Sequence, residues 1–453
     1  MLAPAVSAIL AIAIGAGVGV ALAPVVVPLI RPGVHVGPTG KALRADLAAA
    51  PTSDGLAQFY RERGFRPLWV EASRLRPQAE QLLAVLRGAG RDDLSPQTYH
   101  PQRLALALAR ARSGQPAALA RAELMLSGAL AAYARDLHRA PSGARLAFVD
   151  PAVAVAPTGV RAVLEAAARA PSLADALASV QRVNPIYAEL RADLAAARAA
   201  PHPNAREITL LRINLQRARA LPPDLGPRYI LVNPAAEKLW LYQNGQAIDR
   251  MKVIVGKTSE PTPAMIGLIR YADLNPYWEV PPDLAREIAA KVAAQGLQVL
   301  ARQHLQVLTG WTADAATLDP QTVDWTAVAD GRQIVRLRQL PGPGNMMGRL
   351  KFMLPNPLGV YLHDTPMKGF FADRRRTDSA GCVRLADAAE LGQRLFGHPL
   401  AADPNGGPDQ RLDLPRPTPV YILYLTARPT AAGAIAFAPD IYGRDPALLK
   451  RLG

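Results

Sequence analysis

The hydrophobic pattern of this chain changes near residue 200, and this change most constrains the fold. Residues 41–200 are rich in Ala, Leu and Arg, and their apolar positions recur with helical periodicity. From Tyr229 onward, short strand-like runs replace that pattern. The sequence therefore predicts a multidomain α+β protein, with a helical N-terminal domain over 41–200, a connecting segment over 201–226 and a mostly β domain over 227–427.

Both halves contain segments that predict individual elements. In the first half, the periodicity predicts helices over 54–64, 76–89, 101–112, 117–139, 159–168 and 171–198. In the second half, we expect strands over 229–233, 265–271, 333–338, 349–354, 358–363 and 418–426. Asn244-Gly245 lies between two further strand-like runs, which is the strongest short-range indication of a hairpin.

The stretch from about 280 to 332 interrupts the β pattern. It contains the helix-like segment Leu284–Gln295 and a polar segment around Thr312–Asp319. We expect residues 280–332 to form an inserted subdomain that caps the β domain. Residues 428–453 are expected to form a C-terminal tail.

The beginning of the chain indicates export. Residues 2–30 contain no charged side chain, and about 20 apolar residues are enough to cross a bilayer. Residues 1–30 are therefore expected to be a signal peptide or a membrane anchor, followed by a linker over 31–40. Ala21-Leu22-Ala23 resembles a cleavage site, but Pro24 disfavours cleavage, so both alternatives stay open.

The positive charge of the chain is dispersed. The formal net charge is +15 and the pI about 10.2, but aromatic residues make up only 6% of the chain. Nucleic-acid-binding proteins usually have a clustered basic surface with aromatic residues within it, whereas here the basic runs are as short as Arg374–Arg376. The charge indicates a basic solvated surface or an anionic cell-envelope partner, and no nucleic acid.

Cys382 is the only cysteine, which excludes an intramolecular disulfide. His363 ends a strand-like run 19 positions earlier. A thiol attacks carbonyl groups as a thiolate, and a neighbouring imidazole can take its proton. The pair therefore predicts a nucleophile and its base, with a small buried cysteine as the alternative. Amides near Cys382 could donate to an oxyanion, Arg384 could hold a carboxylate, and Ser379 could order the loop or the substrate.

Other polar residues are interpreted as structural. Asp364 follows His363 and would face the opposite side of a strand, so we expect it to stabilise a turn. The run Arg374–Arg376 is expected in a solvated loop. The chain has no CxxC or HExxH pattern, and we predict no metal site and no cofactor.

These residues resemble a known family. His363 with Ser379-Ala380-Gly381-Cys382-Val383-Arg384 is similar to the His…[Ser/Thr]-x-Gly-Cys-x-Arg signature of the L,D-transpeptidases, which have a YkuD-type catalytic domain. Other segments are similar to the long YcbB-type subgroup: Val255–Lys257, Pro261–Pro263, Asn275–Pro281, Pro341–Asn345, Lys351-Phe352, Tyr361–Pro366 and Asp440–Asp445. The helical half is weakly similar at Phe59-Tyr60, Pro67–Trp69 and Asn184–Tyr187, so the resemblance covers most of residues 41–450.

The resemblance implies a periplasmic enzyme in which a helical scaffold domain precedes the catalytic domain. Cys382 would be the nucleophile and His363 the general base, then acid. The oxyanion hole would lie at Gly381 and Cys382, and the site would be shaped by Arg384, Ser379 and Tyr361. The insertion over 280–332 would cover the acyl-donor cleft. The small peptidoglycan-binding domain common in such proteins has no counterpart between Tyr187 and Leu221.

The reaction implied by the resemblance joins two peptidoglycan stems during cell-wall biogenesis. A tetrapeptide stem would donate an acyl group to Cys382, and a second stem would accept it, giving a 3→3 crosslink that supports cell shape. Carbapenem-type β-lactams would acylate Cys382. Three alternatives stay open: a peptidoglycan hydrolase or amidase with the same site, a non-catalytic anchored envelope scaffold, and an unrelated thiol peptidase. The oligomeric state is also open, as is contact with the inner membrane through residues 1–30.

Overall fold

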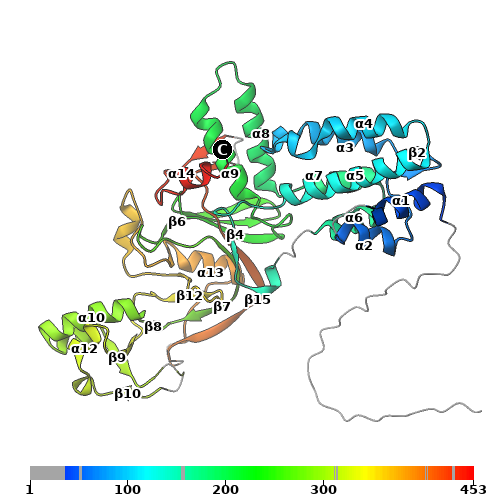
Figure 1. The fold of residues 1–453 in the computed structure, drawn as a ribbon. Coiled ribbons are helices and arrows are strands. Elements are labelled where there is room, and N and C mark those ends of the chain that lie inside the picture. The colour runs from blue at the N-terminus through cyan, green and yellow to red at the C-terminus, as the bar shows by residue number, and fades with distance from the viewer. Residues whose placement is uncertain are drawn as a thin grey trace, which may run out of the picture.

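The computed structural model describes residues 36–49, 54–154, 159–310, 312, 315–403, 405, 407–430 and 434–452. The apolar stretch 2–30 and residues 31–35 of the expected linker lie outside this part of the chain. Within it, no helix combines the length and the apolar character needed to cross a bilayer. Figure 1 shows a helical region on one side, a β-rich region in the centre and a smaller subdomain at the far end.

Helices form the N-terminal region. They are α1 (Pro38–Ala49), α2 (Asp54–Glu62), α3 (Gln78–Arg87), α4 (Pro101–Ala111), α5 (Pro116–Leu137), α6 (Val160–Arg169), α7 (Leu173–Gln181), α8 (Pro185–Ala199) and α9 (Ala205–Ala218). The short strands β1 (Val70–Glu71) and β2 (Arg74–Leu75) form a hairpin, and 3-10 turns lie at η1 (Ala89–Asp92), η2 (Pro96–Tyr99) and η3 (Pro151–Val153). The long helix α5 contacts α1, α4 and α6, so it forms the centre of this region.

A buried carboxylate fixes the centre of the helical region. Glu123, in the middle of α5, is fully buried and accepts hydrogen bonds from the Tyr60 hydroxyl at 2.6 Å and from the backbone N–H groups of Leu68 and Trp69 at 2.5 and 2.8 Å. Burial raises the pKa of Glu123. The side chain of one helix thus satisfies the amides of a loop that packs against it.

Two details of the helical region differ from the expectations. The helix expected over 171–198 is two helices, α7 and α8, because Pro185 lacks an N–H and begins a new helix. Asn184 caps that helix by accepting a hydrogen bond from Tyr187 N at 2.9 Å. Helix α1 begins at Pro38, inside the expected linker.

In the described residues, nine strands form one sheet that closes on itself. They are β3 (Ala147–Phe148), β4 (Arg228–Asn233), β5 (Lys238–Gln243), β6 (Gln246–Ile254), β7 (Met265–Leu274), β12 (Leu350–Met353), β13 (Leu362–His363), β14 (Val383–Leu385) and β15 (Gln410–Ile422). The strand order is β12-β13-β14-β6-β5-β4-β15-β7-β3, and β12 also pairs with β7. Strands β3 and β12 therefore pair with the same edge of β7, at different places along its length.

The core of the β domain lies inside this sheet and under α13 (Ala388–Phe396), where Phe352, Leu362, Val383 and Leu391 are buried. The hairpin expected at Asn244-Gly245 is confirmed, and both residues have positive φ. The strand expected over 358–363 contains only Leu362–His363, since the Asn356 carboxamide bonds to both backbone groups of Val360 and holds a turn there.

The interrupting stretch forms a separate subdomain, which we call the cap (residues 278–339). Its elements are β8 (Trp278–Glu279), α10 (Pro282–Gln295), α11 (Gln298–Arg302), β9 (Leu305–Leu308), β10 (Thr317–Leu318), η4 (Pro320–Thr322), α12 (Trp325–Ala329) and β11 (Arg336–Gln339). The strands pair in the order β10-β9-β11-β8, and an apolar cluster that includes Ile288, Val307 and Leu337 forms the cap's own core. The cap extends beyond the expected 280–332 because β8 and β11 pair antiparallel at its base.

The expected tail is part of the packed structure. It contains β16 (Ala427–Pro429), β17 (Ile435–Phe437) and α14 (Arg444–Leu449). Helix α14 contacts α9, and Asp445 forms a buried ion pair with Arg217 at 2.6 Å. The end of the described chain thereby joins the helical region to the β domain.

Candidate active site

Strand pairing brings the two residues singled out in the sequence to the same place. Strands β13 and β14 are parallel, with Leu362 opposite Val383 and His363 opposite Arg384. Val383 N donates to Tyr361 O at 2.9 Å, which places Cys382, just before β14, beside the start of β13. Cys382 and His363 both line a cleft of about 1010 Å³.

The cleft lies between the β domain and the cap. The cap contributes residues of β8, α10 and β11 and of the α11–β9 connection, including Trp278, Glu279, Glu287 and His304. The β domain contributes Glu260, Lys351, Tyr361, His363, Ser379, Ala380, Cys382 and Arg384. All six site residues expected from the sequence are close together in this region, although Gly381 itself is buried behind the lining.

The hydrogen bond of His363 determines its tautomer. The ring is buried, and Nδ1 lies 2.5 Å from the backbone oxygen of Asp364. Because a carbonyl oxygen only accepts hydrogen bonds, Nδ1 carries the proton and Nε2 keeps its lone pair. Burial, followed by the positive charges of Arg384 and Lys351, lowers the pKa of His363 to about 3. The imidazole is therefore neutral and able to act as a base at neutral pH.

The thiol of Cys382 is also neutral at rest. Burial raises the pKa of Cys382, while the Tyr361 backbone, Lys351 and Arg384 act in the opposite direction. The Sγ atom lies 3.5 Å from the backbone oxygen of Gly359, to which the thiol donates. In the described residues, Cys382 forms no hydrogen bond with His363, and burial shifts the pKa of each group toward its neutral form, so the resting pair is a thiol and an imidazole.

The loop before Cys382 is held by Ser379. Gly381 has φ of +101°, a conformation that favours glycine, and its N–H donates to Ser379 Oγ at 3.2 Å. Ser379 Oγ in turn donates to the Cys382 oxygen at 2.6 Å. The resemblance placed Gly381 and Cys382 at an oxyanion hole. Since the Gly381 amide is engaged within the loop, the Cys382 amide, which has no partner among the described residues, is the one free to donate to an oxyanion.

A second loop supports the first, and the sequence assigned no role to its residues. Thr262 is fully buried; its Oγ1 donates to the Gly381 oxygen at 2.9 Å and accepts from Gly256 N at 2.9 Å. A Cβ at Gly256 would lie 2.1 Å from the backbone oxygen of Glu260, so only glycine fits there. Tyr442 donates to the Gly256 oxygen at 2.8 Å. Only the resemblance of Val255–Lys257, Pro261–Pro263 and Asp440–Asp445 indicated this region.

Positive charge surrounds the thiol. Arg384 lines the cleft, and its Nε is buried without a hydrogen-bond partner among the described residues. Lys351, on β12 opposite His363, lies with Nζ 4.1 Å from the ring centroid of Tyr361. The resemblance included Lys351 but implied no role for it. These groups can receive a substrate carboxylate and stabilise negative charge on sulfur.

Asp364 and Arg376 were both interpreted as structural residues, the first in a turn and the second in a solvated loop. Asp364 accepts from Arg349 N at 2.9 Å and pairs with Lys368 at 2.6 Å, so it does hold a turn. The expectation that Arg376 lies in a solvated loop is wrong. Its side chain is buried and pairs with Glu237 at 3.0 Å, because that carboxylate, 139 positions earlier, compensates the guanidinium.

Comparisons with known proteins agree with this architecture. The family model of the YkuD L,D-transpeptidase catalytic domain matches residues 227–422, and that of the Scaffold domain matches residues 54–194. A protein of Haemophilus influenzae named "Putative L,D-transpeptidase" is 31% identical over 245 residues. That match covers 52% of this chain and 48% of the relative, so the match spans about half the length of the curated relative.

Solved structures are more distant. The catalytic domain of an L,D-transpeptidase from E. faecium, acylated by ertapenem, is 15% identical over 44% of this chain and 98% of its own, with a TM-score of 0.22. An L,D-transpeptidase from Mycobacterium smegmatis is 11% identical over 43% of this chain and 58% of its own, also with a TM-score of 0.22. The two family matches thus show a YkuD L,D-transpeptidase catalytic domain that follows an N-terminal Scaffold domain, as in the long YcbB-type subgroup.

Proposed function

We propose that this protein is a peptidoglycan L,D-transpeptidase that forms 3→3 crosslinks through an acyl-enzyme on Cys382. The observation that carries the proposal is that a neutral His363, whose Nε2 has no hydrogen-bond partner among the described residues, lines the same cleft under the cap as the Cys382 thiol. That arrangement supports nucleophilic catalysis by a thiol that loses its proton as it attacks. From the apolar stretch 2–30, we further propose that the enzyme acts in the periplasm.

In the first half-reaction, His363 Nε2 takes the thiol proton while Sγ bonds to the diaminopimelate carbonyl carbon of a tetrapeptide stem. The Cys382 amide donates to the resulting oxyanion. His363 then protonates the leaving amine, the C–N bond breaks, and D-alanine departs, leaving a thioester. Arg384 and Lys351 bind stem carboxylate and orient the donor.

In the second half-reaction, the side-chain amine of a second stem attacks the thioester. The amine gives its proton to His363, the C–S bond breaks, and the thiolate regains that proton. The cap contributes Glu279 and Glu287 to the cleft wall; Glu279 is paired with Arg336 at 3.0 Å, so Glu287 is the carboxylate that suits an incoming ammonium group. Water in place of the amine would make the same site a hydrolase, so the products distinguish the two reactions.

The test is product analysis by mass spectrometry, with disaccharide-tetrapeptide as substrate and Cys382→Ala in parallel. We expect a 3→3 dimer and free D-alanine from the wild type and neither from the variant. Tripeptide without dimer would contradict crosslinking and support hydrolysis. Equal activity of Cys382→Ala would contradict the role of the thiol, and cleavage of ordinary L-peptides would support a thiol peptidase. No reaction, together with full complementation of a deletion by Cys382→Ala, would support the non-catalytic scaffold.

A further inference from the structure

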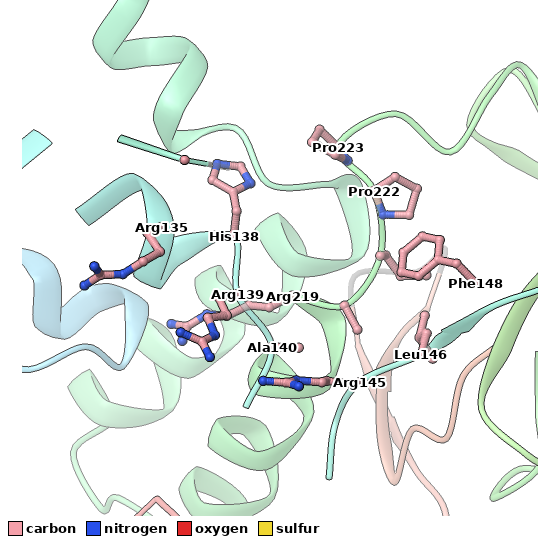
Figure 2. A pocket seen from close by; sticks show the side chains of 13 residues that line it. Arg135, His138, Arg139, Ala140, Arg145, Leu146, Phe148, Arg219, Pro222 and Pro223 are labelled. Carbon is pink, nitrogen blue, oxygen red and sulfur yellow. The ribbon is translucent and has the colours of Figure 1, made fainter. Parts of the chain in front are cut away.

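A second cleft lies where the helical region meets the β domain, which we call the junction cleft. It has a volume of about 610 Å³ and is formed by the end of α5, the segment 138–148 and the end of α9 (Figure 2). It shares no lining residue with the cleft that contains Cys382. Four arginines and one histidine line it, and no acidic side chain does: Arg135, His138, Arg139, Arg145 and Arg219.

The positive charge of this cleft is largely uncompensated. Arg139 and Arg145 are exposed, and neither forms an ion pair or a side-chain hydrogen bond with another described residue. Arg219 is only 4% exposed; its terminal nitrogens donate to Gln216 Oε1 at 2.7 Å and to the Asp92 backbone oxygen, and its buried Nε has no hydrogen-bond partner in that part of the chain. Arg135 does pair with Asp136 at 3.0 Å. Two exposed guanidinium groups, those of Arg139 and Arg145, therefore have donors available for an anionic ligand.

A neighbouring hollow extends the basic surface. It has a volume of about 300 Å³ and shares Arg139, Ala140, Arg145 and Arg219 with the junction cleft. The arginines thus stand between two hollows, which suits an elongated ligand with more than one negative group. Asp136, at the edge of the smaller hollow, is already occupied by Arg135 and the Tyr99 hydroxyl.

The wall facing the arginines is apolar. Leu146, Phe148, Pro222 and Pro223 lie on this side, and Phe148 is 39% exposed (Figure 2). Basic and apolar walls in one cleft favour a ligand that carries anionic groups beside small apolar groups. The cleft contains only one exposed aromatic ring, whereas single-stranded nucleic acids need several stacking platforms.

The backbone next to this wall favours an extended peptide. Strand β3, which includes Phe148, is the last strand of the sheet, and no described strand pairs with its outer edge. Ala147 N and Val149 N donate to the β7 side, at 3.1 and 3.0 Å. The alternation of a parallel ladder turns the N–H and C=O of Phe148 to the outer edge, where a peptide can add by main-chain hydrogen bonds.

We infer that the junction cleft binds a second, non-reacting peptidoglycan peptide stem through its carboxylates, and so holds the enzyme on the wall. This inference rests on the proposed function for the source of the peptide. A stem peptide carries several carboxylates separated by methyl groups and a backbone able to pair with β3. The cleft would thus serve in place of a separate wall-binding domain.

The experiment measures binding of a free peptidoglycan tetrapeptide to the full chain carrying Cys382→Ala, which cannot react. Arg139→Ala/Arg145→Ala removes two exposed guanidiniums of the cleft. Arg87→Ala/Arg110→Ala is the matched control, because it removes the same charge from exposed positions on α3 and α4. The tetrapeptide with its carboxylates amidated tests the anionic requirement, and inorganic phosphate and phosphatidylglycerol vesicles test other anions.

We expect Arg139→Ala/Arg145→Ala to bind the tetrapeptide at least about tenfold more weakly than the control variant does. The amidated tetrapeptide should bind poorly to both variants. In a chain that keeps Cys382, we expect Arg139→Ala/Arg145→Ala to lower crosslinking of intact sacculi by about fivefold or more relative to the control. Turnover of free disaccharide-tetrapeptide should stay within about twofold of the control.

Equal tetrapeptide binding by the two double variants would overturn the inference. It would also be overturned if phosphate or the vesicles, and not the peptide, bound in an Arg139- and Arg145-dependent way, which would indicate a phosphate or membrane site. Failure of the proposed function is distinguishable, because the wild type would then turn over neither substrate, whereas binding to the Cys382→Ala chain is measured without catalysis.

Discussion

Replacing Thr262 by valine tests whether the loop behind Cys382 is held by one buried hydroxyl. The substitution keeps the shape of the side chain and removes the hydrogen bonds of Oγ1 to the Gly381 oxygen and Gly256 N, each 2.9 Å long. Because Thr262 is fully buried, water cannot replace them. Each unsatisfied buried group costs about 1–3 kcal/mol, so the loop should lose about 2–6 kcal/mol.

The loss should appear in catalysis, because Gly381 directly precedes Cys382, the proposed nucleophile. We expect kcat/KM for the free tetrapeptide substrate to fall by about 10- to 100-fold, as is typical when a reacting group is displaced by a fraction of an ångström to about 1 Å. Amide hydrogen exchange of residues 379–382 should accelerate in the same variant.

Thr426→Val is the matched control. Thr426 is also fully buried, and its Oγ1 contacts Asn214 at 2.9 Å, Arg217 at 3.3 Å and Asp445 at 3.2 Å, all outside the catalytic cleft. We expect it to lower thermal stability while leaving kcat/KM within about threefold of the wild type. If Thr262→Val were no less active than Thr426→Val, the supporting role of Thr262 would be refuted.

Three further predictions concern charge and reactivity. Burial raises the pKa of Cys382, and the pKa of His363 lies at about 3, so both groups are neutral at rest. The rate of iodoacetamide alkylation should therefore rise about tenfold per pH unit between about pH 6 and about pH 8. A plateau over that range would mean a thiolate–imidazolium pair. A carbapenem should add its mass to the wild type and not to Cys382→Ala, as intact-protein mass spectrometry would show. Burial raises the pKa of Glu123, so its folded-state value exceeds the unfolded value and its contribution to stability grows as pH falls from neutral toward about 4.5. In Glu123→Gln, Tm should be lower at pH 7 and lack this increase, and an unchanged pH dependence of Tm would contradict the assignment.

Local signals in the sequence were sufficient for much of the fold. Asn244-Gly245 predicted its hairpin because a two-residue turn depends on those residues alone. The helix expected over 171–198 runs through Pro185, since apolar periodicity continues on both sides of that residue. The strand expected over 358–363 was too long because the side chain of Asn356 competes for the backbone of Val360.

The residues of the site that the sequence missed depend on contacts between distant segments. Thr262 lies 119 positions before its partner Gly381, and Tyr442 lies 186 positions after Gly256. Neither residue type indicates a role until the fold brings them together. The burial of Arg376 has the same origin, because its compensating carboxylate, Glu237, lies on a distant turn. The signature around Cys382 was readable because its parts are consecutive in the chain.

The contact of Tyr442 with Gly256 also has a consequence for the order of events during biosynthesis. The Tyr442 hydroxyl, which supports the loop behind Cys382, is synthesised 60 residues after Cys382 itself. A nascent chain that already contains Cys382 and His363 still lacks this support, and it also lacks the Asp445 carboxylate that pairs with Arg217. The surroundings of Cys382 are thus completed only after nearly the whole described chain has been synthesised, when the helical and β regions are joined.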